Sequence, residues 1–172
     1  MPIHVLHRKQ ALPITRAEAW QFFSDPRNLA RITPPKLGFQ IVTPDLPERI
    51  YAGLMIQYRV RPLLGIPLTW LTEITHVTEG HYFADEQRTG PYALWHHEHW
   101  FRDSGSGGVE LEDRITYKLS CGRLSEPAHA LLVRRQLAEI FDYRAVAVET
   151  RFPSKLTESA SQSLTARNAR PD

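Results

Sequence analysis

Cysteine and long apolar segments are both scarce in this chain. Cys121 is the single cysteine among 172 residues, which excludes an internal disulfide framework and a multi-cysteine zinc site. We interpret it as a small filler near a strand end. No stretch approaches the roughly 20 apolar residues of a membrane-spanning helix, and the basic segment 1–12 lacks the apolar core of a signal peptide. These absences predict a soluble, cytoplasmic protein and fit a reducing compartment.

Charge and glycine are too sparse to indicate two further functions. The formal net charge is +2 and no block of basic residues occurs, so we expect no nucleic-acid partner. The glycines of segment 105–108 mark a turn and not a phosphate-binding loop, because no helix follows them closely. We therefore assign no cofactor.

A hydrophobic period of two dominates the middle of the chain. It extends from Gly38 to Ser120, with Gly, Pro and Asp at the spacing of hairpin turns. After a first strand near residues 3–12, the pattern predicts six strands, over 39–43, 54–61, 68–77, 82–88, 94–102 and 109–119. A meander of antiparallel strands follows from this spacing.

Helices are expected at both ends of the meander. Thr15 and Glu18 have the spacing of a capping box, and Asp25 before Pro26 is a second helix start, so two short helices follow the first strand. The second of them should end before Pro34. A long helix is expected over about 125–151, with an apolar stripe of Leu131, Leu132, Ala138, Phe141, Ala145 and Val148.

This order of elements predicts an α+β fold. A seven-stranded curved antiparallel sheet should wrap around the long C-terminal helix, with the two short helices after the first strand. We expect residues 1–152 to form a single domain. Residues 153–172 contain few large apolar side chains and are expected to form a disordered tail.

Polar residues recur on one face of three successive strands. Because side chains alternate along a strand, each strand presents one such set. The sets are Phe83, Asp85 and Gln87; Trp95, His97, His99 and Phe101; and Leu111, Asp113, Ile115 and Tyr117. Burying a polar group without a hydrogen bond costs about 2–7 kcal/mol. If the faces coincide, these groups must pair with one another, with water or with a ligand.

Segment 83–101, which reads FADEQRTGPYALWHHEHWF, carries a family resemblance. It resembles the helix-grip superfamily called SRPBCC, which includes START domains and the birch pollen allergen, and it is most similar to small bacterial, polyketide cyclase-like members. Asp113, Tyr117 and the segment 140–144 extend the resemblance, which covers about residues 3–152.

The resemblance implies a deep, mostly apolar cavity between the sheet and the long helix. Such a cavity binds a lipid, polyketide, isoprenoid or other hydrophobic small molecule. Combining this with the strand pattern, we expect the ligand-binding residues to be Phe83, Asp85, Gln87, Trp95, His97, His99, Phe101, Asp113, Tyr117, Phe141 and Arg144. Arg144 has this role if it reaches Asp85 or Asp113 as a buried counter-ion.

Three interpretations of His97 and His99 stay open. With Asp85 or Asp113 they carry donor atoms for zinc or iron, but the sequence shows no set of three or four convergent ligands, so we assign no metal. As acid–base catalysts they would abstract a proton from an activated methylene while Tyr117 stabilises the oxyanion. We favour the third, a hydrogen-bonded network that shapes the cavity and holds a polar part of the ligand.

The favoured function is therefore non-covalent binding of a hydrophobic small molecule by a monomer or weak dimer. The alternative is a cyclase or dehydratase with His97, His99, Asp113 and Tyr117 as candidate catalytic residues. A second alternative is a protein-interaction or regulatory module that uses the apolar segment 62–67. That segment is favoured as a loop folded onto the core, and it is also the candidate for transient membrane contact.

Overall fold

The computed structural model describes residues 2–62, 65–105, 107–120 and 126–154. Cys121, residues 63 and 64 of the apolar segment, and the predicted tail from residue 155 lie outside the described residues. The strands are β1 (His4–Leu12), β2 (Gln40–Ile41), β3 (Met55–Val60), β4 (Leu68–Thr78), β5 (Tyr82–Thr89), β6 (Tyr92–Asp103) and β7 (Val109–Leu119). The helical elements are α1 (Arg16–Phe23), η1 (Pro26–Ile32), η2 (Pro35–Leu37) and α2 (Glu126–Arg151).

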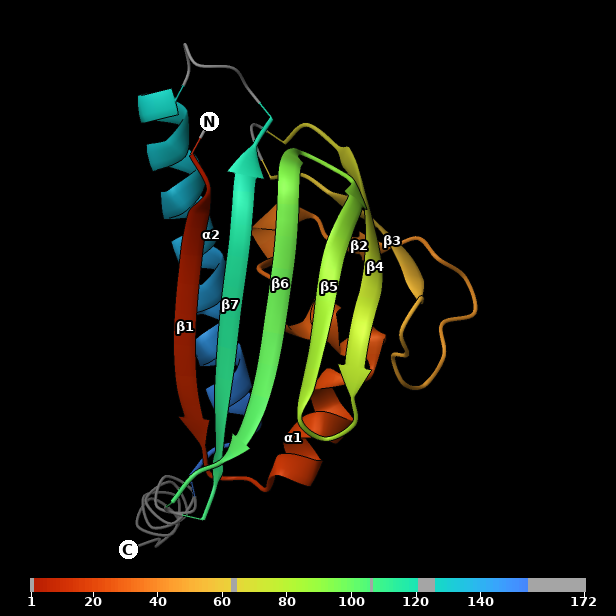
Figure 1. Ribbon diagram of the computed structural model, residues 1–172, viewed down its shortest axis with the longest axis vertical. Helices are drawn as coiled ribbons and strands as arrows, with labels where there is room; N and C mark the ends of the chain where they lie inside the picture. Colours follow the sequence, from red (N-terminus) through yellow and green to blue (C-terminus); the bar gives the residue numbers. More distant parts are fainter. Residues whose placement is uncertain (1, 63–64, 106, 121–125, 155–172) are drawn as a thin grey trace, which may run out of the picture.

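The seven strands form one sheet in the order β1-β7-β6-β5-β4-β3-β2, and every neighbouring pair is antiparallel. Only β1 departs from a plain meander, because it pairs with the last strand, β7. The helical elements all lie on one face of the sheet, with α2 running behind β1 and β7 (Figure 1). The predicted α+β helix-grip arrangement is confirmed.

Both predicted helix starts are present. The Thr15 side chain accepts a hydrogen bond from the backbone of Glu18, whose carboxylate accepts one from the Thr15 backbone in return. Asp25 accepts a hydrogen bond from the Arg27 backbone and caps η1. The second short helix is nevertheless a 3₁₀ helix, and a separate 3₁₀ turn, η2, follows Pro34. Sequence reasoning missed this turn.

Two predicted details differ from the structure. The strand expected over 39–43 is only two residues long, since β2 is an edge strand that pairs with β3 alone. Leu131 and Leu132 are also not part of the buried stripe of α2, because 69 % and 61 % of their surfaces are exposed. The stripe that packs on the sheet consists of Val133, Leu137, Phe141 and Val148. The buried stripe of α2 therefore keeps Phe141 and Val148 of the predicted set and includes Val133 and Leu137 in place of the two leucines.

The two faces of the sheet differ in chemistry. The inner face carries the core, in which aromatic side chains such as Trp20, Phe83 and Phe101 pack edge to face or stacked. The outer face carries ion pairs, including His96 with Glu86 at 3.1 Å and Arg88 with Glu86 at 2.9 Å. Within the described residues no helix has the length and hydropathy needed to cross a bilayer.

Candidate functional site

A cavity of about 200 Å³ lies between the inner face of the sheet and the helical layer. A single water needs only about 10–15 Å³ on the same scale, so the space is large enough for an organic molecule. Most of the lining is apolar or aromatic. The sheet contributes Ile56, Tyr58, Trp70, Ile74, Phe83 and Trp95, and the helical elements contribute Phe22, Leu29, Ile32, Leu137, Ile140 and Phe141.

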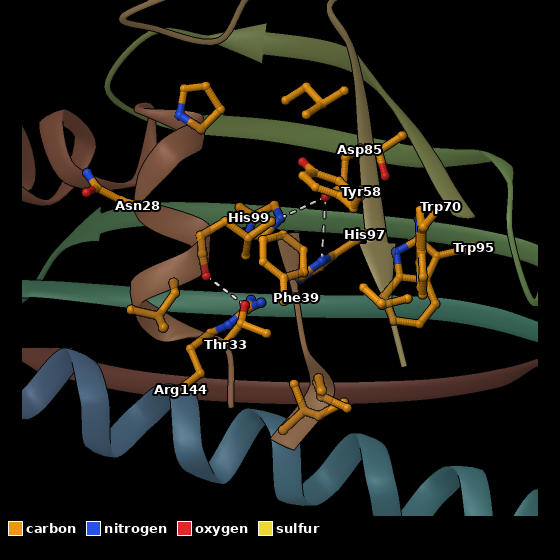
Figure 2. A pocket seen from close by; sticks show the side chains of 18 of the residues that line it. Asn28, Thr33, Phe39, Tyr58, Trp70, Asp85, Trp95, His97, His99 and Arg144 are labelled. Carbon is orange, nitrogen blue, oxygen red and sulfur yellow. Dashed lines mark hydrogen bonds and ion pairs between the residues drawn. The ribbon is translucent and has the colours of Figure 1, made fainter. Parts of the chain in front are cut away.

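Polar side chains enter the cavity from both layers. Asp85, His97 and His99 rise from β5 and β6, and Arg144 reaches toward them from α2 (Figure 2). Thr72, Asn28, Thr33 and Gln136 also line the cavity. In Figure 2 the two histidines lie between Asn28 on one side and the aromatic pair of Trp70 and Trp95 on the other. The cluster of Asp85, His97, His99 and Arg144 thus sits partway along a mostly apolar cavity.

Four residues of the sheet form a closed ring of contacts. Strand pairing places Asp85 opposite His97 and His99 opposite Asp113. Asp85 Oδ2 lies 3.0 Å from His99 Nε2 and 3.6 Å from His97 Nδ1. Asp113 Oδ1 lies 3.0 Å from His97 Nε2 and 2.9 Å from His99 Nδ1. Each imidazole therefore directs one nitrogen toward Asp85 and the other toward Asp113.

Burial and hydrogen bonding displace the pKa values of the two histidines in opposite directions. Burial, together with the neighbouring His99, lowers the pKa of His97 to about 4. Burial also acts to lower the pKa of His99, but its contacts with Asp113 and Asp85 outweigh burial and raise it. The two neighbouring imidazoles therefore differ in proton affinity, and His99 is the more readily protonated of the two.

The two carboxyl groups of the ring are held ionised. Burial acts to raise the pKa of Asp113, but hydrogen bonds from His97 and His99 outweigh it and hold the pKa well below its usual value. Burial likewise opposes ionisation of Asp85, and the hydrogen bond from His99 lowers its pKa overall. The buried ring thus contains two carboxylates.

Arg144 adds a positive charge beside the four-residue cluster of Asp85, His97, His99 and Asp113. Its Nη1 lies 4.0 Å from Asp113 Oδ1, and its guanidinium carbon lies 4.6 Å from the centre of the Phe141 ring. Arg144 Nε is buried and has no hydrogen-bond partner among the described residues. The expected approach of Arg144 to a buried aspartate is therefore present, with one donor left unused.

The predicted ligand-binding residues divide into two groups. Seven line the cavity: Phe83, Asp85, Trp95, His97, His99, Phe141 and Arg144. The other four share the inner face of the sheet but do not line the cavity: Gln87, Phe101, Asp113 and Tyr117. Gln87 is bonded to the backbone of Tyr92 across the β5–β6 turn, Phe101 packs on Trp20 and Phe23, and Tyr117 packs on Trp95 and Tyr92. Asp113 lies behind the histidines.

Sequence reasoning missed the part of the cavity wall that β3, β4 and the segments around η2 form. Tyr58, Trp70 and Thr72 line the cavity from β3 and β4, and Phe39 and Thr33 line it from the segments around η2. Burial raises the pKa of Tyr58 far above its usual value, so its hydroxyl stays protonated. The alternation of Ile56, Tyr58 and Val60 in the sequence is typical of a strand with one buried face, but it does not show that the face borders a cavity.

The same architecture occurs in solved structures of low sequence identity. No protein-family model matches this chain, and no curated protein matches it in sequence. In structure it is similar to a START superfamily protein from Mycobacterium smegmatis, with a TM-score of 0.62, 14 % identity and coverage of 87 % of this chain and 97 % of that one. The chain has the START-like helix-grip fold.

Two further solved structures extend this likeness. Protein Ms6760 from M. smegmatis has a TM-score of 0.62 and 19 % identity, and covers 92 % of this chain and 98 % of its own. Major latex-like protein 151 from Panax ginseng has a TM-score of 0.64 and 11 % identity, and covers 88 % and 99 % respectively. At these identities the similarity establishes the fold, and the chemistry of the START-like cavity here must be argued from its own residues.

Proposed function

We propose that this chain binds a hydrophobic small molecule non-covalently in the cavity between the sheet and α2. The observation that carries the proposal is an interior space of about 200 Å³ whose lining is chiefly apolar and aromatic. Removing apolar surface from water contributes about 25 cal/mol per Å², so such a lining favours an apolar ligand. A lipid, a polyketide or an isoprenoid has the required chemistry.

The polar cluster supports a ligand with a hydrogen-bonding group partway along its length. Asp85, His97 and His99 border the cavity between its aromatic regions, and Arg144 has an unused buried donor beside them. An unpaired polar ligand group would be costly to bury there, whereas a hydroxyl or carbonyl oxygen finds donors within reach. The cluster therefore selects orientation, and the apolar lining supplies affinity.

A titration with Nile red tests the binding proposal. We expect a saturable fluorescence increase at one dye per chain, and displacement of the dye by a long-chain fatty acid or by an isoprenoid alcohol. A strictly linear response without saturation would contradict a binding cavity. The dye measures access to the cavity and makes no assumption about the natural ligand.

The histidine pair favours proton-transfer catalysis as a second candidate function. His97, whose pKa is lowered, and His99, whose pKa is raised, both border the cavity, and pairs of groups with separated pKa values are typical of acid–base sites. A cyclase or dehydratase would use them on a bound carbonyl compound. Under this alternative, His97→Ala abolishes turnover and leaves ligand affinity nearly intact. Equal losses of turnover and affinity would count against it.

The cavity argues against the third candidate, a purely protein-binding module. Such a module needs a filled interior and an exposed apolar patch. Among the described residues of segment 62–67, Ile66 is the exposed large apolar side chain, at 56 %, and one such side chain offers little area for docking.

A further inference from the structure

We propose that Asp85, His97 and His99 form a binding site for a divalent transition-metal ion at the floor of the cavity, with Asp113 orienting both imidazoles. One potential ligand atom from each of the three residues lies within 4.8 Å of the others. The sequence alone supplied two histidines on one face and no third convergent ligand. Strand pairing supplies it, because Asp85 stands directly opposite His97.

The distances within the ring fit metal coordination. In a tetrahedral site with metal–ligand bonds of about 2.0–2.1 Å, neighbouring ligand atoms lie about 3.3 Å apart. Asp85 Oδ2 lies 3.0 Å from His99 Nε2 and 3.6 Å from His97 Nδ1, on either side of that value. An ion bound to Asp85 Oδ2, His99 Nε2 and His97 Nδ1 requires the shorter distance to lengthen and the longer one to shorten, each by about 0.3 Å.

The different positions of the two aspartates also fit a metal site, with Asp85 as a ligand and Asp113 as the carboxylate that orients the imidazoles. Histidines that bind a metal through one nitrogen almost always donate the other N–H to a carboxylate, a carbonyl or water. Here the nitrogens that face away from Asp85, His97 Nε2 and His99 Nδ1, both lie within 3.0 Å of Asp113 Oδ1. Asp113 does not line the cavity, whereas Asp85, His97 and His99 do. The proposed ligands thus face the cavity, and the orienting carboxylate lies behind them.

The donor set indicates the class of ion. Two imidazoles and one carboxylate, without a thiolate, suit Zn²⁺ or Fe²⁺, and three protein ligands leave at least one coordination position for a water or a cavity ligand. With a divalent ion bound to neutral imidazoles, the two aspartates and Arg144 leave one net positive charge. That charge would favour an anionic oxygen, such as a hydroxide, an enolate or a phenolate, in the open position.

A metal titration of the full, chelator-treated chain tests the proposal without any organic ligand, so its outcome is independent of the proposed cavity binding. Zn²⁺ or Co²⁺ is added in competition with a chromophoric chelator. We expect one equivalent to bind, with visible Co²⁺ absorption typical of low coordination number. His97→Ala, His99→Ala and Asp85→Asn should each weaken binding more than Asp113→Asn, for which about 10- to 100-fold is expected.

The outer face of the same strands provides the matched control. His96 and Glu86 form a histidine–carboxylate pair at 3.1 Å on β6 and β5, so His96→Ala removes an equivalent imidazole away from the cavity. It should leave metal binding unchanged. Loss of binding in His96→Ala, with binding retained in His97→Ala and His99→Ala, would show an adventitious surface site and overturn the proposal.

A measurement on the unmodified chain decides the matter if a buried variant fails to fold. One equivalent of Zn²⁺ should shift the imidazole ¹⁵N resonances of His97 and His99. Failure to bind a stoichiometric ion, or binding that leaves these two resonances unmoved, would overturn the proposal.

Discussion

His97 and His99 lie with their ring centroids 3.7 Å apart, yet their surroundings displace their pKa values in opposite directions. Both contact the same two carboxylates. His99 has nitrogens 3.0 Å and 2.9 Å from them, whereas His97 has one at 3.0 Å and the other at 3.6 Å. The more closely held imidazole, His99, therefore binds a proton more strongly, and a proton on His99 disfavours one on His97.

This relationship predicts two distinct titrations in the metal-free protein. Because the pKa of His97 is lowered to about 4, its imidazole should stay neutral as the pH falls from 7 to about 4. The titration midpoint of His99 should lie above the ordinary imidazole pKa of 6.5. Imidazole ¹⁵N shifts recorded across this range check both statements. A common midpoint near 6.5 for the two rings would refute the proposed charge distribution.

Arg144 should lower the pKa of the His97 imidazole. Its guanidinium lies 4.0 Å from Asp113, so Arg144→Met removes a nearby cation and should raise the pKa of His97. The same ¹⁵N titration measures the change. Arg135→Met is the control, because Arg135 lies on the same helix with 78 % of its side chain exposed and pairs with Glu139. Identical His97 titrations in both variants would mean that Arg144 does not affect the pKa of His97.

Asp113 should contribute strongly to stability. Asp113→Asn removes one partner from a buried charged network, which should lower the free energy of unfolding by about 3 kcal/mol at pH 7. Urea unfolding measures it, with the outer-face variant Glu86→Gln expected to change stability by less than about 1 kcal/mol. Comparable effects of the two substitutions would show that the ring adds no more than a surface pair.

The contribution of Asp113 should also depend on pH in one direction. Its pKa in the folded protein is lower than its ordinary value of 3.8, so folding favours the ionised form. The stabilisation is therefore complete above about pH 4 and is lost as the pH falls through the folded-state pKa. The stability difference between Asp113→Asn and the parent chain should accordingly narrow below pH 4. A stability difference that widens below pH 4 would contradict a lowered pKa for Asp113.

Filling the cavity should block ligand entry without unfolding the chain. Ile140 lines the cavity from α2, and Ile140→Trp should weaken Nile red binding at least about tenfold, a loss of about 1.4 kcal/mol. Overpacking should cost about 1–3 kcal/mol of stability. Val146→Trp adds the same bulk at a position of α2 that is 62 % exposed and should leave dye binding intact. Equal dye affinities in the two variants would place the dye elsewhere.

Local rules predicted most of the fold. The period-two pattern located the strands of the meander, and the residue pairs Thr15–Glu18 and Asp25–Pro26 located the first two helices. Strand parity also placed His97 and His99 on one face of β6, since side chains alternate along a strand. These features depend on neighbours in the chain and are therefore visible in it.

The remaining features depend on contacts between distant segments. Parity could not show that Asp113 lies behind the histidines while Asp85 borders the cavity, because that depends on register and on sheet curvature. The exposure of Leu131 and Leu132 depends on how α2 packs on the sheet. Gln87 was predicted on the cavity face, but the backbone of Tyr92 provides its hydrogen bonds at the turn.

Native mass spectrometry of the gently purified protein tests directly whether the cavity binds a hydrophobic molecule. We expect one such molecule per chain, either retained from the cell or taken up from a lipid and isoprenoid extract, and released on denaturation. A chain that keeps its ligand-free mass after incubation with such an extract would contradict the proposed binding function.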